Sequence, residues 1–399
     1  MKYDVIIAGG GLVGATLACA LGRQGWRVAL VEARAPRDAP AQSGFDPRVS
    51  AISPVSVRLL EALGVWPYVP SERRQAYRKM CVWDASGQGA VHFDAAAIGL
   101  AALGHIVENR ILQAALETRI GELDTIVWHR PASLEALTLG AAGARARVAD
   151  TRLRASLVVG ADGRGSRVRE AAGLRVTRAS YRQCALVTTV GIERGHAETA
   201  WQRFLVGGPL ALLPLPEGRG AIVWSTTPQH AETLLGLDDD DFETALGDAF
   251  GTRFGAFQVV GPRAIFPLQH LRARRYVSER VALVGDAAHT IHPLAGQGVN
   301  LGFLDAAALS EVLEHARARH RDPGSYASLR PYERWRTGHN LLIGEAMSGF
   351  KWLFGSRWAP LVLARNLGLD LTDRAAPLKK LFMRMATGGG GDLPRIARV

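Results

Sequence analysis

The sequence predicts an α/β fold that begins with a Rossmann-like nucleotide-binding unit, and three patterns support this prediction. First, Tyr3–Ala8 is an apolar run typical of a buried strand, Gly11–Gln24 has helical character, and Arg27–Val31 is a second apolar run. A strand, a helix and a strand in this order form a right-handed βαβ unit that opens a parallel sheet. Second, short β-rich runs alternate with polar or glycine breaks from Thr125 to Gly160, which predicts a meander. Third, the chain becomes helical and rich in Trp and Arg after Pro331.

Further elements follow the same reasoning. Gln202–Thr226 contains two apolar runs around Pro216–Gly220, which predicts a hairpin. Arg280–Val284 predicts another buried strand, and Gly298–His315 predicts an apolar helix. Gly388–Gly391 predicts a flexible break before a short tail.

The composition is that of an ordinary globular protein. The chain has 399 residues, 48% of them hydrophobic and 21% charged, which is enough for two or more lobes. Cys19, Cys81 and Cys184 stand far apart, which argues against a disulfide scaffold, a zinc site or a CxxC redox centre and fits a reducing compartment. We see no secretory signal pattern and no apolar run of the roughly 18 residues that span a bilayer. We therefore expect a soluble or peripheral protein.

The charge balance is strongly basic, because 48 Lys and Arg against 37 Asp and Glu give a net charge of +11. Such a balance attracts nucleic acid, anionic lipid or acidic ligands without choosing among them, and a solvated basic face explains it equally well. The basic clusters do not alternate with aromatic residues as a surface for single-stranded nucleic acid would, so we expect no nucleic-acid partner. The clusters are Arg73/Arg74/Arg78/Lys79, Arg272/Arg274/Arg275 and Arg317/Arg319/Arg321.

A glycine-rich turn after the first strand is the first sign of a nucleotide site. Gly9, Gly11 and Gly14 form a GxGxxG pattern, with Leu12 and Val13 inside it, where a strand meets a helix. The glycines permit a tight turn and a close approach of backbone to pyrophosphate, whose negative charge the exposed N–H groups favour. Glu32 closes the second strand, where a carboxylate can accept both hydroxyls of an adenosine ribose. An acid there disfavours a 2′-phosphate, so this site predicts FAD or NAD rather than NADP.

A second motif, Asp162-Gly163, follows the strand that ends at Gly160 and precedes a basic helix start at Arg164–Arg167. Taken alone, it is equally consistent with a plain joint between a strand and a helix.

A third motif, Gly285-Asp286, ends the strand at Arg280–Val284 and leads through a glycine-rich loop into a helix. Asp286 can bond a polyol hydroxyl, and a positive helix start suits the negative N1–C2=O edge of a reduced flavin. An NAD site needs no second clamp so far along the chain, whereas the longer FAD does. The pairing of the first and third motifs therefore predicts tightly bound FAD. The candidate residues in the loop and helix start are Pro293, Gly296, Gln297, Gly298, Val299 and Asn300.

With these motifs in order and spacing, the sequence resembles the class A flavoprotein monooxygenases, the p-hydroxybenzoate hydroxylase-like group, over nearly the whole chain. The resemblance implies that Asp162-Gly163 serves both FAD and a passing nicotinamide. It also implies that Asp286 holds the ribityl chain and Gly296–Gly298 the isoalloxazine edge. Asn109 stands where the group usually has Arg or Gln, and Arg110 is adjacent, so either residue is a candidate for contact with FAD.

Further segments resemble the ubiquinone-biosynthesis hydroxylases, which act on polyprenylated phenols at the membrane. The resemblance places Arg48 beside the flavin and implies a lipid-like phenolic substrate, with a membrane surface or a quinone-biosynthesis complex as a possible partner. We expect a cytoplasmic protein, with peripheral attachment to the inner membrane as the alternative. The segments are Phe45–Ser53, Leu63–Trp66, Val107–Arg110, Gly208–Pro214 and His289–Gly298.

The predicted organisation is a Rossmann-like FAD-binding domain with an inserted β-rich substrate domain and a C-terminal helical region. We expect the FAD-binding domain at residues 1–75, 99–177 and 269–330, and the substrate domain at 76–98 and 178–268. The helical region is expected at 331–399.

The resemblance implies a monooxygenase in which NAD(P)H, as a transient reductant, and O2, as a co-substrate, generate a flavin C4a-hydroperoxide that hydroxylates an aromatic ring. The sequence has no second GxGxxG in a βαβ unit and no CxxC, which disfavours a two-dinucleotide disulfide reductase. His289 and His292 are better explained as structural hydrogen-bonding residues than as catalytic ones, and we assign no catalytic residue and no metal ligand. A reductase or dehydrogenase of a lipid-like substrate and a flavoprotein scaffold without turnover remain as alternatives.

The C-terminal stretch offers a membrane-binding candidate. Leu378, Leu381, Phe382 and Met385 share one face of a predicted helix, and Lys379, Lys380 and Arg384 fall outside that face. Phe350–Phe354 and Arg357-Trp358 mix aromatics with cations, as interfacial segments often do. The alternative is a helix that caps the FAD-binding domain.

Overall fold

The computed structural model describes residues 2–35, 44–87, 89–290, 297–355, 359–389 and 391–398. A mostly parallel sheet carries the strand order β19-β20-β12-β1-β2-β8. In this sheet β1 pairs in parallel with β2 and with β12, and the βαβ prediction is thereby confirmed. The strands are β1 (Val5–Ala8), β2 (Val28–Val31), β8 (Ile126–His129), β12 (Leu157–Gly160), β19 (Val277–Ser278) and β20 (Val281–Leu283).

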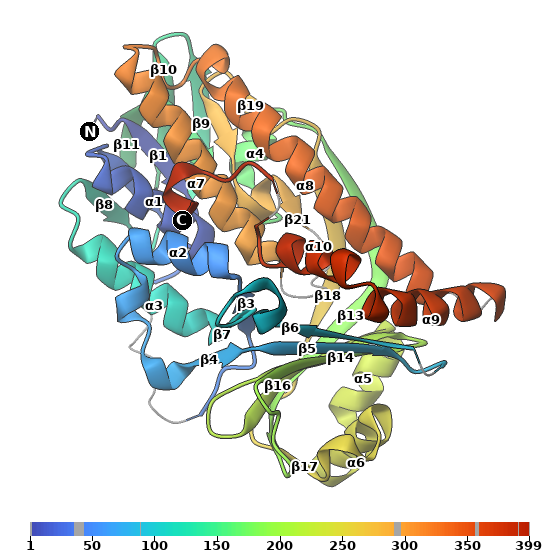
Figure 1. Ribbon diagram of the computed structural model, residues 1–399. Coiled ribbons are helices and arrows are strands. Elements are labelled where there is room, and N and C mark those ends of the chain that lie inside the picture. Colours follow the sequence, from blue (N-terminus) through green and yellow to red (C-terminus); the bar gives the residue numbers. More distant parts are fainter. Residues whose placement is uncertain are drawn as a thin grey trace.

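Helices cover this sheet because its strands are apolar along their length rather than alternating. Helix α1 (Leu12–Arg23) packs against α3 (Asn109–Gly121) and α7 (Gln297–Ala318), and its small buried residues allow close contact. The short helix α4 (Arg167–Ala171) follows β12. Figure 1 shows α1 and α7 side by side in front of the sheet.

The predicted meander is confirmed in its middle part. Strands β9 (Leu134–Gly140), β10 (Gly143–Val148) and β11 (Thr151–Ala155) form an antiparallel sheet. The meander prediction was wrong at both ends, because β8 and β12 belong to the parallel sheet. A short apolar run cannot by itself distinguish a meander strand from a parallel strand.

A larger, mostly antiparallel sheet forms the second part of the molecule, with the order β21-β18-β13-β16-β15-β14-β5-β6. Helices α5 (Pro228–Gly236) and α6 (Asp239–Phe250) cover one of its faces, and Figure 1 shows them below it. The predicted hairpin is confirmed, because β15 pairs with β16 across a turn with positive φ at Glu217 and Gly218. The strands are β5 (Lys79–Asp84), β6 (Ala90–Asp94), β13 (Val176–Ile192), β14 (Thr199–Leu205), β15 (Gly208–Pro214), β16 (Arg219–Thr226), β17 (Phe257–Val259), β18 (Ala264–Ala273) and β21 (His289–Thr290).

A small antiparallel sheet lies between these two parts. It contains β3 (Val49–Ile52), β7 (Gly104–Glu108) and β4 (Arg74–Tyr77), with β7 in the centre. Helix α2 (Pro54–Ala62) follows β3 directly. Along the sequence, β3 follows β2 of the parallel sheet, and β4 precedes β5 of the larger sheet. The small sheet therefore lies between the two larger sheets in the sequence as well.

Three helices end the chain, and Figure 1 shows α8 running diagonally across the molecule to α9 and α10 at its side. They are α8 (Tyr326–Gly355), α9 (Ala359–Arg374) and α10 (Ala376–Ala386). The predicted helical region is confirmed, but its start after Pro331 was wrong, because α8 begins at Tyr326 and contains Pro331. Pro331 lies in the second turn, where a proline removes one backbone hydrogen bond and crowds the preceding turn, yet α8 continues through it.

The last segments are held to the rest of the molecule. Arg365 of α9 forms a buried ion pair with Asp84 of β5, Nε to Oδ2, at 2.5 Å. Near the chain end, Arg395 pairs with Glu311 of α7 at 3.1 Å. Within the part of the chain that is described, no helix has the length and apolarity needed to cross a membrane.

Candidate functional site

The glycines of the first motif differ in how much space surrounds them. Gly9 has a φ of 102°, and a Cβ there would lie 2.3 Å from the carbonyl oxygen of Ala161. A Cβ at Gly14 would lie 1.9 Å from the carbonyl oxygen of Gly9. A Cβ at Gly11, in contrast, would meet no atom within 4 Å. Gly9 and Gly14 are therefore required for packing, whereas Gly11 leaves open space at the start of α1.

Glu32 lies at the end of β2 and holds the same loop. Its Oε2 accepts a hydrogen bond from the Gly10 amide at 2.8 Å, and its Oε1 accepts one from the Arg34 amide at 3.0 Å. A carboxylate has about four acceptor sites, so these bonds leave acceptor capacity for a ribose.

Two residues that the sequence analysis missed also fix this loop. Gln113 of α3 donates a hydrogen bond from Nε2 to the Gly10 carbonyl oxygen at 2.8 Å. Trp128 of β8 packs against Gly10 so closely that a Cβ there would lie 2.6 Å from the indole ring. Both residues come from distant elements, and neither belongs to a local motif that could have revealed it.

The second motif lies beside the first. Asp162 follows β12, and its Oδ2 accepts a hydrogen bond from the Arg167 amide at 2.7 Å. Its other oxygen, Oδ1, is buried and has no hydrogen-bond partner among the described residues. Gly163 adopts a φ of 75°, a conformation that glycine accommodates best. A buried acceptor without a partner is costly, which favours a ligand hydroxyl or amide at this position.

The third motif contacts the first although the sequence separates them widely. A Cβ at Gly285 would lie 3.2 Å from the side chain of Val13, and one at Gly302 would lie 2.4 Å from it. The small size of both glycines brings Gly285-Asp286 and the start of α7 against the GxGxxG turn. This contact brings the first and third motifs together, as the sequence prediction of one long dinucleotide requires.

Asp286 is exposed to solvent, yet desolvation raises the pKa of its carboxyl group, against the opposing effect of His289 and Arg164. Helix α7 begins nearby at Gln297, and a Cβ at Gly298 would meet nothing within 4 Å. Pro293, Gly296 and His292 lie outside the described residues.

The helix residues Val299 and Asn300 have packing roles in the structure. Val299 is partly buried and contacts the main core. Asn300 is buried, donates to the Ala51 carbonyl oxygen at 2.8 Å and accepts from the Ser53 amide at 3.0 Å. Asn300 therefore ties the start of α7 to β3 and α2.

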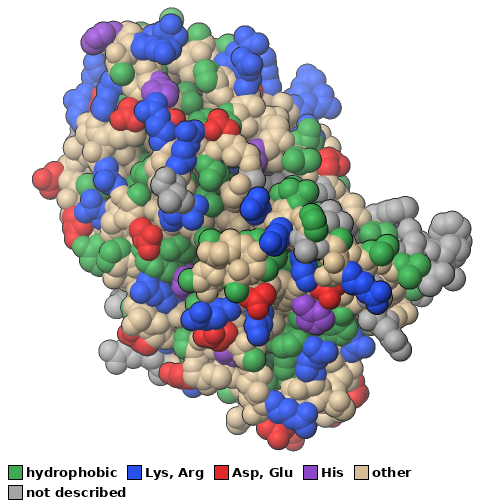
Figure 2. Space-filling view, in the orientation of Figure 1, with side chains coloured by type: hydrophobic (Ala, Val, Ile, Leu, Met, Phe, Trp, Pro, Cys, Tyr) green, Lys and Arg blue, Asp and Glu red, His purple; other side chains and the backbone are tan. Residues whose placement is uncertain are grey.

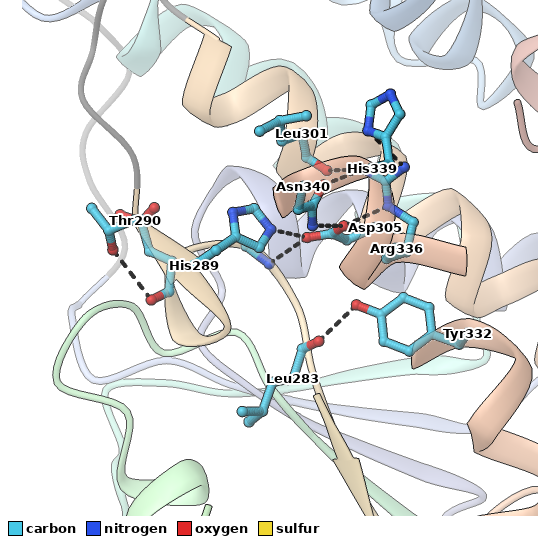
Figure 3. Close-up of polar contacts among 11 residues, drawn as sticks. Leu283, His289, Thr290, Leu301, Asp305, Tyr332, Arg336, His339 and Asn340 are labelled. Atoms are coloured by element: carbon cyan, nitrogen blue, oxygen red, sulfur yellow. Dashed lines mark hydrogen bonds and ion pairs between the residues drawn. The ribbon is translucent and has the colours of Figure 1, made fainter. Parts of the chain in front are cut away.

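A buried network of hydrogen bonds and ion pairs contacts the third motif at Gly285 (Figure 3). Asp305 of α7 is fully buried, and its Oδ2 lies 2.5 Å from His289 Nε2 and accepts from the Gly285 amide at 3.1 Å. Its Oδ1 accepts from Arg336 Nε at 2.7 Å and from Asn340 Nδ2 at 3.1 Å. Although desolvation opposes it, the charges of His289 and Arg336 hold the pKa of Asp305 below its usual value.

This network explains His289 as a structural residue, as the sequence analysis favoured. His289 is buried and its Nε2 is occupied by Asp305. Arg336 and Asn340 belong to α8, so the network also attaches the C-terminal helical region to the predicted FAD site. The sequence gives no local signal for Asp305, Arg336 and Asn340, because they lie in two separate helices.

The remaining candidates lie around the small sheet. Arg48 is exposed, and its guanidinium carbon lies 5.5 Å from the ring centroid of Phe266 in β18. Asn109 Oδ1 accepts from Ser50 Oγ at 2.6 Å, and Arg110 pairs with Glu108 at 2.9 Å. Asn109 and Arg110 thus stand side by side with different partners, and contact of either with FAD stays a prediction.

Comparisons with known proteins support FAD as the cofactor. The family described as FAD binding domain matches residues 2–339. The chain is 42% identical to the ubiquinone hydroxylase UbiL of Rhodospirillum rubrum, with 99% of this chain and 92% of that protein covered. It is 38% identical to the 3-demethoxyubiquinol 3-hydroxylase of Escherichia coli, with 96% and 98% covered.

Two solved structures share the fold. PqsL of Pseudomonas aeruginosa in complex with 2-aminobenzoylacetate has a TM-score of 0.74 at 26% identity, covering 92% of this chain and 99% of that one. The p-nitrophenol 4-monooxygenase PnpA of Pseudomonas putida has a TM-score of 0.79 at 19% identity, covering 98% and 100%. The second likeness concerns the fold alone.

Proposed function

This chain belongs to the ubiquinone-biosynthesis hydroxylase family of FAD-dependent monooxygenases, and we propose that it hydroxylates the ring of a polyprenylated phenol related to ubiquinone. The bound FAD, reduced by NAD(P)H, supplies the activation of O2. The protein binds and orients the cofactor and the phenol and keeps water from the reacting atoms.

The first motif suits the pyrophosphate and ribose of FAD. Gly11 leaves space where the pyrophosphate would approach the N-terminus of α1, whose exposed amides favour negative charge. Glu32 would accept the ribose hydroxyls while it keeps its bond to the Gly10 amide. Gln113 would keep that loop in place through the Gly10 carbonyl oxygen.

The other two motifs suit the rest of the cofactor. Asp162 Oδ1 has no partner among the described residues and would accept a hydrogen bond from the cofactor. Asp286 is exposed beside the start of α7 and would bond the ribityl chain. The open start of α7 at Gly298 would direct its positive end toward the flavin N1–C2=O edge, where negative charge develops on reduction. Arg48 would lie between the flavin and the larger sheet.

The single observation that carries this assignment is the contact of Val13 with Gly285 and Gly302. The contact supports FAD because it brings the first and third motifs next to each other, as one FAD molecule would need and a lone NAD would not. The test is ligand-stimulated turnover by the purified yellow protein. NAD(P)H oxidation should be slow alone and several-fold faster with a phenol that carries a prenyl chain. Equal rates with and without the phenol would contradict the hydroxylase function.

We also propose that the C-terminal helices attach the protein to an anionic membrane, where a polyprenyl phenol resides. Met383 of α10 is buried and packs with Ala95 and Leu103, so this residue anchors the helix. Leu381 and Met385 are 54% and 40% exposed on α10. The side chain of Leu378 lies outside the described residues.

Charge and neighbouring apolar residues support the same surface. Lys380 and Arg384 are exposed on α10, and Leu367 and Leu371 are exposed on α9. Figure 2 shows hydrophobic and basic side chains mixed over the face formed by these helices. Anionic lipid adds roughly 1 kcal/mol of attraction for each nearby Lys or Arg.

A further inference from the structure

A fully buried carboxylate, Glu108, ends strand β7 and has two cationic partners. Its Oε1 lies 2.6 Å from Arg73 Nη2, and its Oε2 lies 2.9 Å from Arg110 Nη2. Burying an ionised carboxylate is costly unless it is paired and hydrogen-bonded, and removal of one partner leaves an uncompensated charge. The hydrogen bonds are to Oε2, whereas Oε1 has the ion pair with Arg73 and no hydrogen-bond partner among the described residues, so the buried charge of Glu108 depends on both arginines.

All three side chains converge on one short segment, Gly44–Arg48. The Asp46 amide donates to Glu108 Oε2 at 2.7 Å. Arg73 and Arg110 both donate to the Gly44 carbonyl oxygen, at 2.9 and 2.8 Å. Phe45 lies between Gly44 and Asp46 in the sequence, and the Arg73 guanidinium carbon lies 4.3 Å from its ring centroid. The segment is thus fixed at successive backbone and side-chain positions.

The Gly44–Arg48 segment holds Arg48 against the larger sheet. Asp46 Oδ1 accepts from the Arg48 amide at 2.7 Å, and the Arg48 carbonyl oxygen accepts from the Asn109 amide at 2.9 Å. The backbone of Arg48 is therefore held on both sides, while its guanidinium lies over Phe266. Phe266 pairs with Ala185 of β13, so the Arg48 side chain lies against the larger sheet.

We propose that Glu108 is a positioning residue, which acts with Arg73 and Arg110 through the Gly44–Arg48 segment to hold Arg48 at the junction of flavin and phenol. This inference rests on the proposed function. A small displacement of the ring from the activated oxygen strongly slows transfer. In the coupled reaction, NAD(P)H, H⁺, O2 and the phenol give NAD(P)⁺, water and the hydroxylated ring. Without transfer, NAD(P)H, H⁺ and O2 give NAD(P)⁺ and hydrogen peroxide instead.

The experiment measures the share of NAD(P)H oxidation that appears as peroxide, in FAD-loaded full-length protein with a phenol that bears one short prenyl chain. Glu108→Gln should keep bound FAD and raise the peroxide share several-fold. Asp46→Ala removes the acceptor of the Arg48 amide without disturbing the buried ion pairs, and it should have the same effect. Glu135→Gln, which loses an exposed ion pair with Arg147, is the matched control and should leave the share unchanged.

The outcome with Arg48→Ala separates this inference from the proposed function. If Arg48→Ala raises the peroxide share and Glu108→Gln in the same background raises it no further, Glu108 acts through Arg48. If Arg48→Ala uncouples the reaction but Glu108→Gln and Asp46→Ala stay as coupled as the wild type, the positioning role is refuted. If none of the variants uncouples, the role is also refuted, although hydroxylation by the wild type would still stand. Absence of any hydroxylated product from the wild type would instead refute the proposed function.

Discussion

Val13 and Gly302 are in contact across the joint between α1 and α7, and a Cβ at Gly302 would lie 2.4 Å from Val13 Cγ2. Val13 belongs to the first cofactor motif, and Gly302 lies in the helix that follows the third. The distance between the first and third motifs, which we propose hold FAD, therefore depends on the absence of a side chain at Gly302.

The first prediction concerns this joint. Gly302→Ala should separate the helices and lower FAD affinity, at a typical overpacking cost of about 1–3 kcal/mol. Val13→Ala in the same chain should restore part of the loss, because it removes the atoms that clash. Gly338→Ala is the control, since that glycine of α8 has open space around its Cβ position. Fluorescence titration of apoprotein with FAD measures the effect, and a Gly302→Ala affinity equal to that of the wild type would contradict the account.

The second prediction separates fold from cofactor binding within the first motif. Gly14→Ala places a Cβ 1.9 Å from the Gly9 carbonyl oxygen and should destabilise the folded protein. Gly11→Ala meets no protein atom within 4 Å, so it should fold normally yet bind FAD more weakly. Thermal unfolding of the apoproteins and FAD titration check the two effects. Normal FAD binding by Gly11→Ala would show that the pyrophosphate lies elsewhere.

The third prediction concerns pH. The pKa of Asp305 is lowered in the folded protein, so ionised Asp305 stabilises the fold above the ordinary Asp pKa of about 3.9 and loses this effect as the pH falls below it. Asp305→Asn should cost about 3–5 kcal/mol at pH 7, because it leaves the charge of Arg336 buried without its carboxylate. The cost should shrink as the pH falls below 4. Urea unfolding at several pH values measures it, and a cost that grows in acid would contradict the assignment.

The candidate cofactor residues could be predicted from the sequence, but their partners could not. The positions of Gly9, Glu32, Asp162 and Gly285 follow from local spacing, because a turn that approaches a phosphate requires particular residues next to one another. The partners of those residues do not follow, because Gln113 and Asp305 lie in distant helices whose neighbours depend on the complete packing. Glu108 is a similar case, since its proposed role depends on Arg73, which is separated from β7 in the sequence by β4, β5 and β6.

The assignment of the β strands shows the same limit. An apolar run such as β12 fits a parallel strand and a meander strand equally well, and only its neighbours β1 and β20 decide the matter. The contact of Arg48 with Phe266 could not be predicted either, because Phe266 belongs to a strand of the larger sheet that carries no local motif.

The fourth prediction concerns the membrane. The wild type should float with anionic liposomes at low salt and dissociate as salt rises. Lys380→Glu with Arg384→Glu should abolish flotation, whereas Lys379 contributes less because it pairs with Asp373 at 3.0 Å. Arg152→Glu with Arg154→Glu, two exposed positions on β11, is the matched control for net charge. Equal flotation of both double variants, or none by the wild type, would point to delivery of the substrate by a protein partner.

The most direct test of the central claim is the origin of the new oxygen atom. The purified FAD protein is incubated with NAD(P)H, a prenylated phenol and isotopically labelled O2, and the product is analysed by mass spectrometry. If the protein is a monooxygenase, the product should be a hydroxylated ring that carries one labelled oxygen atom, and the other labelled atom should appear in water. Label found only in water or peroxide, with the ring unchanged, would contradict the hydroxylase function and support a reductase or oxidase with the same FAD site.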